Sequence, residues 1–243
     1  MSTGKTTLAL LLSALLPAGA AWAAGNDTLV YCSEASPESF NPQIASSGPS
    51  FVASSQVLYN RLVSFDPVKN TPIPSLATEW HVSEDGKTWT FTLRQGVKFN
   101  SNKFFKPTRD FNADDVLFSV LRQMDPQHPY HKVSQGNYEY FHDVGLDKLI
   151  KSVKKVDDYH VQFELNEPNA AFLADWGMDF ASILSAEYGE AMLKKGTPEN
   201  VDNWPVGTGP YALQQYKVDS QIRYIANPHY WEGEVPTKHL IFS

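Results

Sequence analysis

The stretch EWHVSEDGKTWTFTL, residues 79–93, decides the type of fold that the chain can adopt. Apolar residues alternate with polar ones on both sides of Asp85-Gly86, a period typical of strands with one buried face. Asp-Gly also tolerates the positive φ values that tight hairpin turns require. The stretch therefore predicts an antiparallel hairpin and a sheet. The alternating residues are Trp80, Val82, Trp89, Phe91 and Leu93.

Further strands are predicted on both sides of this hairpin. A second hairpin is centred on the turn Asp157-Asp158, because apolar residues alternate after this acidic pair and also precede it. These apolar residues are Val153, Val156, Val161, Phe163 and Leu165. Single strands are predicted at 28–32, 211–213, 222–224 and 240–243.

The clearest predicted helix spans residues 113–124, whose apolar residues recur at the spacing of one helix face. Asn112 is placed to cap it, and Asp114 and Asp115 lie in the first turn, where the helix dipole favours negative charge. Adjacent residues on a helix do not face each other, so this acidic pair is interpreted as a complement to the dipole and not as a catalytic pair.

Two other segments have helical spacing. Residues 185–195 predict a helix that ends at Gly196, and residues 52–65 predict a short amphipathic helix. Strands and short helices alternate irregularly along the chain. This mixture predicts an α+β or mixed α/β fold.

The N-terminus has the layout of a secretory signal peptide. Lys5 precedes the apolar run Leu8–Leu16, and the small-residue triplet Ala21-Trp22-Ala23 follows it. Residues 1–23 are therefore predicted to be a signal peptide that is cleaved after Ala23. The alternative is a hydrophobic N-terminal helix of a cytosolic protein.

Composition narrows the class of protein. The chain has 243 residues and a formal net charge of −7, which argues against nucleic-acid binding because phosphate binding needs clustered Lys and Arg.

Its one cysteine, Cys32, excludes an internal disulfide and a Cys-rich zinc site. An unpaired cysteine is unusual in an exported protein, and the strand 240–243 has no turn after it. Either the chain is a fragment with a partner for Cys32 beyond Ser243, or Ser243 is a natural terminus and the thiol is buried.

No catalytic constellation is present in the sequence. His128, His131, His142 and Asp125 lie in a region whose prolines and polar residues favour an irregular surface loop over a metal site. The sequence Gly207-Thr-Gly-Pro210 lacks the following helix of a phosphate-binding loop. The remaining sequence features are typical of a binding protein. Its candidate residues are the aromatics Tyr138, Tyr140 and Phe141 and the small polar stretch Ser46, Ser47 and Gly48, although an ordinary surface loop would explain them too.

Many ordered segments together resemble the family 5 extracellular solute-binding proteins of ABC importers. Among them are LVYCSE (29–34), FNPQ (40–43), YEYF (138–141) and GTGP (207–210). The other segments are 37–38, 58–63, 76–77, 79–80, 82–88, 91, 93–94, 96–98, 112–116, 129–134 and 178–185. The likeness thus runs through nearly all of residues 28–243.

The resemblance implies one lobe of a periplasmic-binding-protein type II fold. It implies a first-lobe core formed by 24–67 and 186–243, a subdomain inserted at 68–185, and a second lobe missing beyond residue 243. It also implies a function. The protein would be a non-catalytic, monomeric periplasmic receptor without a cofactor, which captures dipeptides or other short peptides and delivers them to an ABC permease in the inner membrane.

The resemblance also implies roles for individual residues. Ser46, Ser47 and Gly48 match the segment of the first lobe that contacts the ligand. Cys32 matches a family cysteine whose disulfide partner lies beyond the last residue here. Haem or antimicrobial peptides are alternative ligands within the family. A secreted hydrolase that uses the carboxylates or the histidines of 125–142 is the alternative from another class.

Overall fold

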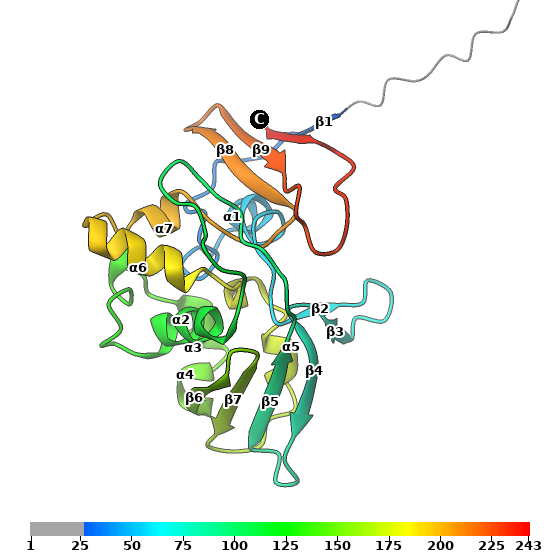
Figure 1. Cartoon of the computed structure of the whole chain (residues 1–243), viewed down its shortest axis with the longest axis vertical. Coiled ribbons are helices and arrows are strands. Elements are labelled where there is room, and N and C mark those ends of the chain that lie inside the picture. Colours follow the sequence, from blue (N-terminus) through cyan, green and yellow to red (C-terminus); the bar gives the residue numbers. More distant parts are fainter. Residues whose placement is uncertain (1–26) are drawn as a thin grey trace, which may run out of the picture.

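Two four-stranded sheets lie at opposite ends of the part of the molecule that the computed structural model describes, residues 27–243 (Figure 1). Short helices and irregular segments fill the space between them. The predicted signal peptide, with its cleavage site after Ala23, lies outside the described residues. No helix among the described residues combines the length and the apolar character needed to cross a membrane.

The lower sheet in Figure 1 contains both predicted hairpins, which are thereby confirmed, but the second turn lies at Asp158-Tyr159, one residue later than predicted, because Asp157 still pairs with His160. Its strands run antiparallel in the order β4-β5-β7-β6, and Gly86 takes a φ of 71° in the first turn. Residues of β5 are alternately buried and half-buried, as the period of two requires. The bounds are Ala77–Val82 for β4, Thr88–Leu93 for β5, Ile150–Asp157 for β6 and His160–Leu165 for β7.

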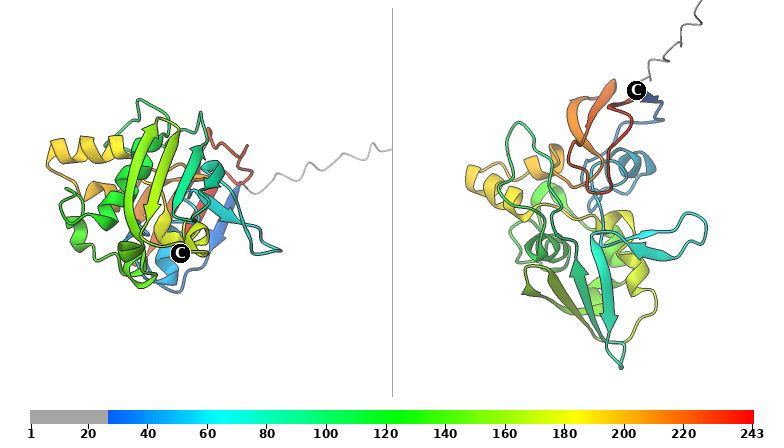
Figure 2. Two further views of the ribbon diagram at one scale, coloured as in Figure 1. Left: turned by 90° about the horizontal axis from the view of Figure 1, so that it is seen from below. Right: turned by 45° about the vertical axis from the view of Figure 1, so that its right-hand side comes forward.

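The upper sheet joins the first described strand to the last. β1 pairs in parallel with β10, and β9 and β8 follow in antiparallel order. The right-hand view of Figure 2 shows the C-terminus beside the blue strand β1. The bounds are Thr28–Tyr31 for β1, Tyr211–Lys217 for β8, Gln221–Ala226 for β9 and His239–Phe242 for β10, which confirms the four predicted strands. A separate two-stranded sheet consists of β2, Val63–Phe65, and β3, Pro72–Pro74.

Helix α2, Ala113–Met124, has the predicted bounds and cap. The Asn112 side chain accepts a hydrogen bond from the backbone N–H of Asp114, and Asp115 accepts one from the backbone N–H of Asn112, which completes a capping box. Asp114 and Asp115 bind different partners, Lys155 and Arg109, as expected for neighbours that do not face each other.

Helix α6, Ala186–Lys195, ends at Gly196 in the left-handed conformation, with a φ of 73°, so this prediction is also confirmed. The remaining helices of the described residues are short. They are α1 (Gly48–Ala53), α3 (Glu139–Asp143), α4 (Leu146–Leu149), α5 (Phe172–Asp175) and α7 (Asn200–Asn203), with the 3-10 helices η1 (Val133–Gln135) and η2 (Asp179–Ala181).

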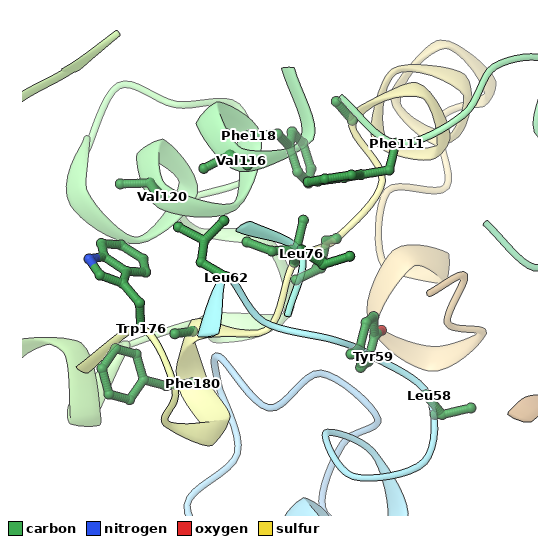
Figure 3. Packing of buried hydrophobic residues seen from close by; sticks show 14 of the residues in the cluster. Leu58, Tyr59, Leu62, Leu76, Phe111, Val116, Phe118, Val120, Trp176 and Phe180 are labelled. Carbon is green, nitrogen blue, oxygen red and sulfur yellow. The ribbon is translucent and has the colours of Figure 1, made fainter. Parts of the chain in front are cut away.

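The prediction of a helix within 52–65 is wrong. Helix α1 already ends at Ala53, turns follow, and residues 59–62 form neither helix nor strand. We call residues 57–63 the central segment. Its apolar side chains from Leu58 to Val63 are buried because distant parts of the chain pack around it, as Figure 3 shows for Leu62, which lies beside Leu76.

The central segment bonds to several parts of the chain through its backbone. The carbonyl of Leu58 accepts the N–H of Gly209 at 3.0 Å, and the carbonyl of Leu62 accepts the N–H of Ala77 at 2.9 Å. The other pairs are Tyr211 N with Val57 O, Ile183 N with Asn60 O, Leu76 N with Arg61 O, and Val63 N with Trp176 O. The segment thus connects the two four-stranded sheets and the helices between them.

The glycines of Gly207-Thr-Gly-Pro210 allow this close contact. A Cβ atom on Gly207 would lie 1.9 Å from the carbonyl oxygen of Leu58, and one on Gly209 would lie 2.5 Å from the carbonyl carbon of Leu58. The Thr208 hydroxyl donates to the Asn60 side-chain oxygen at 2.9 Å. The motif therefore serves backbone packing.

We expect Gly207→Ala to lower the free energy of unfolding by roughly 3 kcal/mol, because the new methyl group meets backbone and not a flexible side chain. Urea denaturation measures this loss. Gly196→Asn is the control, because no atom lies within 4 Å of a Cβ there and Asn tolerates a positive φ. Equal stability of the two variants would contradict the assigned packing role.

Asp175, at the end of α5, makes stability depend on pH. Burial raises the pKa of its carboxyl from 3.8 to about 6. The folded state therefore holds a proton that the unfolded state has released, so the stability contributed by this group is present below the unfolded pKa and is lost as pH rises to about 6. We expect the melting temperature of Asp175→Asn, relative to the unaltered protein, to rise between pH 4 and pH 7. A difference independent of pH would contradict this assignment.

Candidate functional site

The candidate ligand-binding segment, Ser46–Gly48, lies on the surface between a buried turn at 41–45 and the start of α1. Ser46 and Gly48 are exposed, and Ser47 is half-buried. No atom lies within 4 Å of the place where a Cβ on Gly48 would stand, so the space in front of it is open. A ligand can therefore approach the backbone of this segment closely.

Polar groups behind the segment hold it in place. The buried Ser50 hydroxyl accepts the N–H of Glu38 at 2.8 Å and lies 2.9 Å from the Ser47 hydroxyl. The Glu38 carboxylate accepts the N–H of Ser46 at 3.4 Å. Within the described residues the Ser46 hydroxyl has no hydrogen-bond partner, so it is available to a ligand.

Two half-buried aromatic side chains flank the segment. The rings of Phe51 and Tyr140 meet edge to face, with centroids 5.5 Å apart, and the Tyr140 hydroxyl donates to the Ser46 carbonyl at 3.4 Å. The structure thus separates the aromatic cluster of the sequence, because Tyr138 and Phe141 are buried in the core while Tyr140 faces the segment. Glu38, Ser50 and Phe51 were missed by the sequence reasoning.

Cys32 is exposed, directly after β1. The next residue, Ser33, donates its backbone N–H to the carbonyl of Ser243 at 2.9 Å, so the thiol lies near the last described residue. Within the described residues no hydrogen bond joins Cys32 to Ser46–Gly48.

The histidines of the 125–142 region face separate partners. His128 accepts the N–H of Tyr130 at 3.2 Å, His131 donates to the carbonyl of Arg122 at 2.9 Å, and His142 lies 3.1 Å from Asp147. Burial lowers the pKa of His128. Throughout residues 27–243, no three His, Cys, Asp or Glu side chains are grouped to hold a metal ion.

Comparison with known proteins assigns the chain to a family. Residues 71–243 match the family described as bacterial extracellular solute-binding proteins, family 5 middle. The chain belongs to this family. The resemblance found in the sequence is thereby confirmed, and so is the mixed α/β fold of a periplasmic-binding-protein lobe.

The relatives of this family 5 member include peptide-binding and haem-binding proteins. It is 57% identical over 241 residues to the dipeptide-binding protein of Escherichia coli (strain K12), an alignment that covers 99% of the chain and 44% of the relative. It is 51% identical over 218 residues to heme-binding protein A of Haemophilus influenzae, covering 90% of the chain and 40% of the relative.

A solved structure agrees with these relatives. The dipeptide binding protein from Pseudoalteromonas sp. SM9913 in complex with Met-Leu superposes with a TM-score of 0.87 at 45% identity, covering 89% of the chain and 43% of that structure. The chain therefore spans less than half the length of each of these proteins. The boundaries at 67 and 185 and the ligand-contacting role of Ser46–Gly48 stay predictions.

Proposed function

We propose that this protein is the periplasmic substrate-binding component of an ABC importer, which captures dipeptides or other short peptides and delivers them to a permease in the inner membrane. The observation that carries this proposal is the 57% identity to a dipeptide-binding protein over nearly the whole chain. A similar structure that holds Met-Leu supports the same ligand class. The protein acts as a monomer and leaves the peptide chemically unchanged.

The proposed architecture follows the two four-stranded sheets. The strands of the upper sheet come from 28–31 and 211–242, within the proposed first-lobe core of 24–67 and 186–243. The strands of the lower sheet lie between 77 and 165, within the proposed inserted subdomain of 68–185. The second lobe is formed by chain beyond residue 243, and the ligand lies between the lobes.

The Ser46–Gly48 segment suits a peptide that varies in its side chains. The Ser46 hydroxyl and the exposed backbone of the segment bind polar groups of the peptide main chain, which all dipeptides share. The rings of Phe51 and Tyr140 beside it offer an apolar surface without a fixed shape requirement. The segment thus contributes affinity while other contacts set specificity.

We expect Ser46→Leu to weaken binding of Met-Leu about tenfold or more, because the larger side chain fills the open space in front of the segment. Isothermal titration calorimetry on the full-length protein measures the affinity. Ser220→Leu, at the exposed turn between β8 and β9, is the control and should bind as the unaltered protein does. Equal affinities for all three proteins would remove Ser46 from the site.

Haem is the second candidate ligand, because heme-binding protein A is also a close relative. Titration of haem into the full-length protein distinguishes a haem ligand from a peptide ligand. Under the peptide proposal, Met-Leu raises the melting temperature and haem produces no shifted Soret band. A saturable Soret shift without a peptide effect would replace the peptide by haem, and release of free amino acids from Met-Leu would favour a hydrolase.

We also propose that Cys32 forms a disulfide with a cysteine beyond residue 243. Its exposed thiol supports this pairing, and so does the match to a family cysteine that the sequence resemblance implies. In the protein purified from the periplasm, Cys32 should resist thiol alkylation before reduction and react fully after it. Full alkylation without a reductant, measured by mass spectrometry, would contradict the pairing.

A further inference from the structure

A fully buried ion pair lies behind the candidate ligand-binding segment. The Arg122 guanidinium in α2 and the Asp202 carboxylate in α7 are 2.8 Å apart, and their side chains are 0% and 1% exposed. Burial lowers the pKa of Arg122, but Asp202 and Tyr138 raise it by more, so the guanidinium keeps its charge. Such a pair seldom stabilises a fold more than well-packed apolar residues would, so its position calls for another explanation.

The ion pair is hydrogen-bonded to the turn that leads into Ser46. The Asn41 side chain donates to the Asp202 carboxylate at 2.8 Å. The same side chain accepts the N–H of Gln43 at 2.9 Å, and the Asn41 carbonyl accepts the N–H groups of Ile44 and Ala45, both at 3.2 Å. Asp202 therefore fixes the residue that organises the turn immediately before Ser46.

The ion pair is also hydrogen-bonded to a strained loop, residues 134–138. Ser134, Gln135 and Tyr138 have φ values of 54°, 57° and 50°, which are unfavourable for residues other than glycine. The Ser134 hydroxyl donates to Asp202 at 2.6 Å, and Arg122 donates to the Tyr138 hydroxyl at 3.2 Å. The ion pair thus bonds to both ends of the strained stretch.

The loop and the turn then meet at the segment. A Cβ on Gly136 would lie 2.9 Å from the Tyr138 ring and 3.1 Å from the Ile44 side chain, so loop and turn are in close contact there. Two residues after Tyr138, the Tyr140 hydroxyl bonds to the Ser46 carbonyl. Both routes from the buried pair therefore end at Ser46.

We infer that Arg122 and Asp202 are positioning residues for the Ser46–Gly48 segment, because they fix the Asn41 turn that precedes it and the strained loop that places Tyr140 against it. This inference rests on the proposed peptide-binding function for its affinity readout. Neither residue touches the ligand. Their effect on binding passes through Asn41 and Tyr140.

The test uses variants that each remove one hydrogen bond to Asp202 and leave the ion pair in place. Asn41→Ala removes the bond between the turn and Asp202, and Ser134→Ala removes the bond between the loop and Asp202. Because Ser134 is exposed, its variant should fold even if Asn41→Ala does not. The control is Arg109→Gln, which deprives another fully buried carboxylate, Asp115, of its guanidinium partner at the start of α2. Neither Arg109 nor Asp115 bonds to the turn or the loop.

Two readouts on the full-length protein decide the matter. Hydrogen exchange of the amides of residues 44–47 in the ligand-free protein should accelerate in both test variants and stay unchanged in Arg109→Gln. Met-Leu should bind each test variant about tenfold more weakly, equivalent to about 1.4 kcal/mol, while Arg109→Gln lowers the melting temperature without loss of affinity.

Two outcomes would overturn the inference. One is unchanged exchange at residues 44–47 in the test variants. The other is a loss of affinity in Arg109→Gln that equals the loss in the test variants when the melting temperatures fall equally. If the unaltered protein fails to bind Met-Leu, the proposed function fails. The exchange comparison still decides the positioning role in that case, because it needs no ligand.

Discussion

The rest of the structure depends on one constraint: the backbone of the central segment, residues 57–63, needs hydrogen-bond partners. The segment is partly or fully buried and belongs to no helix or strand along most of its length, so its peptide groups must find partners elsewhere. These partners lie at 76–77, 176, 183 and 209–211, parts of the chain that are far apart in sequence. Satisfying them together places the lower sheet, the intervening helices and the upper sheet around one line of backbone.

Elements whose signals are local were predictable. The hairpin at Asp85-Gly86 carries its alternation and its turn within one short stretch, and α2 carries both its apolar stripe and its Asn112 cap. The helix predicted within 52–65 failed for the opposite reason. The spacing of Val57, Leu58 and Leu62 fits a helix face, but these side chains pack against distant segments that surround an irregular backbone.

The candidate site shows the same division. The residue types of Ser46–Gly48 made the segment a binding candidate, but small polar residues are equally typical of ordinary loops, and only the family resemblance favoured a ligand contact. Tyr138 and Tyr140 look equivalent in sequence, yet one is buried and the other faces the segment. Nor does any local pattern pair Arg122 with Asp202, because each residue alone is interpretable as an exposed charge and only the tertiary structure brings the two together.

The parallel pairing of β1 with β10 has a consequence for the order of folding. Thr28 aligns with His239, so roughly 200 residues must be synthesised before the first strand meets its partner. Hairpins of the lower sheet, by contrast, join strands that are neighbours in sequence and can form as soon as they emerge. The N-terminal strand, with Leu29, Val30 and Tyr31 largely exposed even after pairing, is thus the last to be secured. A nascent chain of this kind matures from its middle outward, and strand β1 stays accessible to chaperones until the later part of the chain arrives.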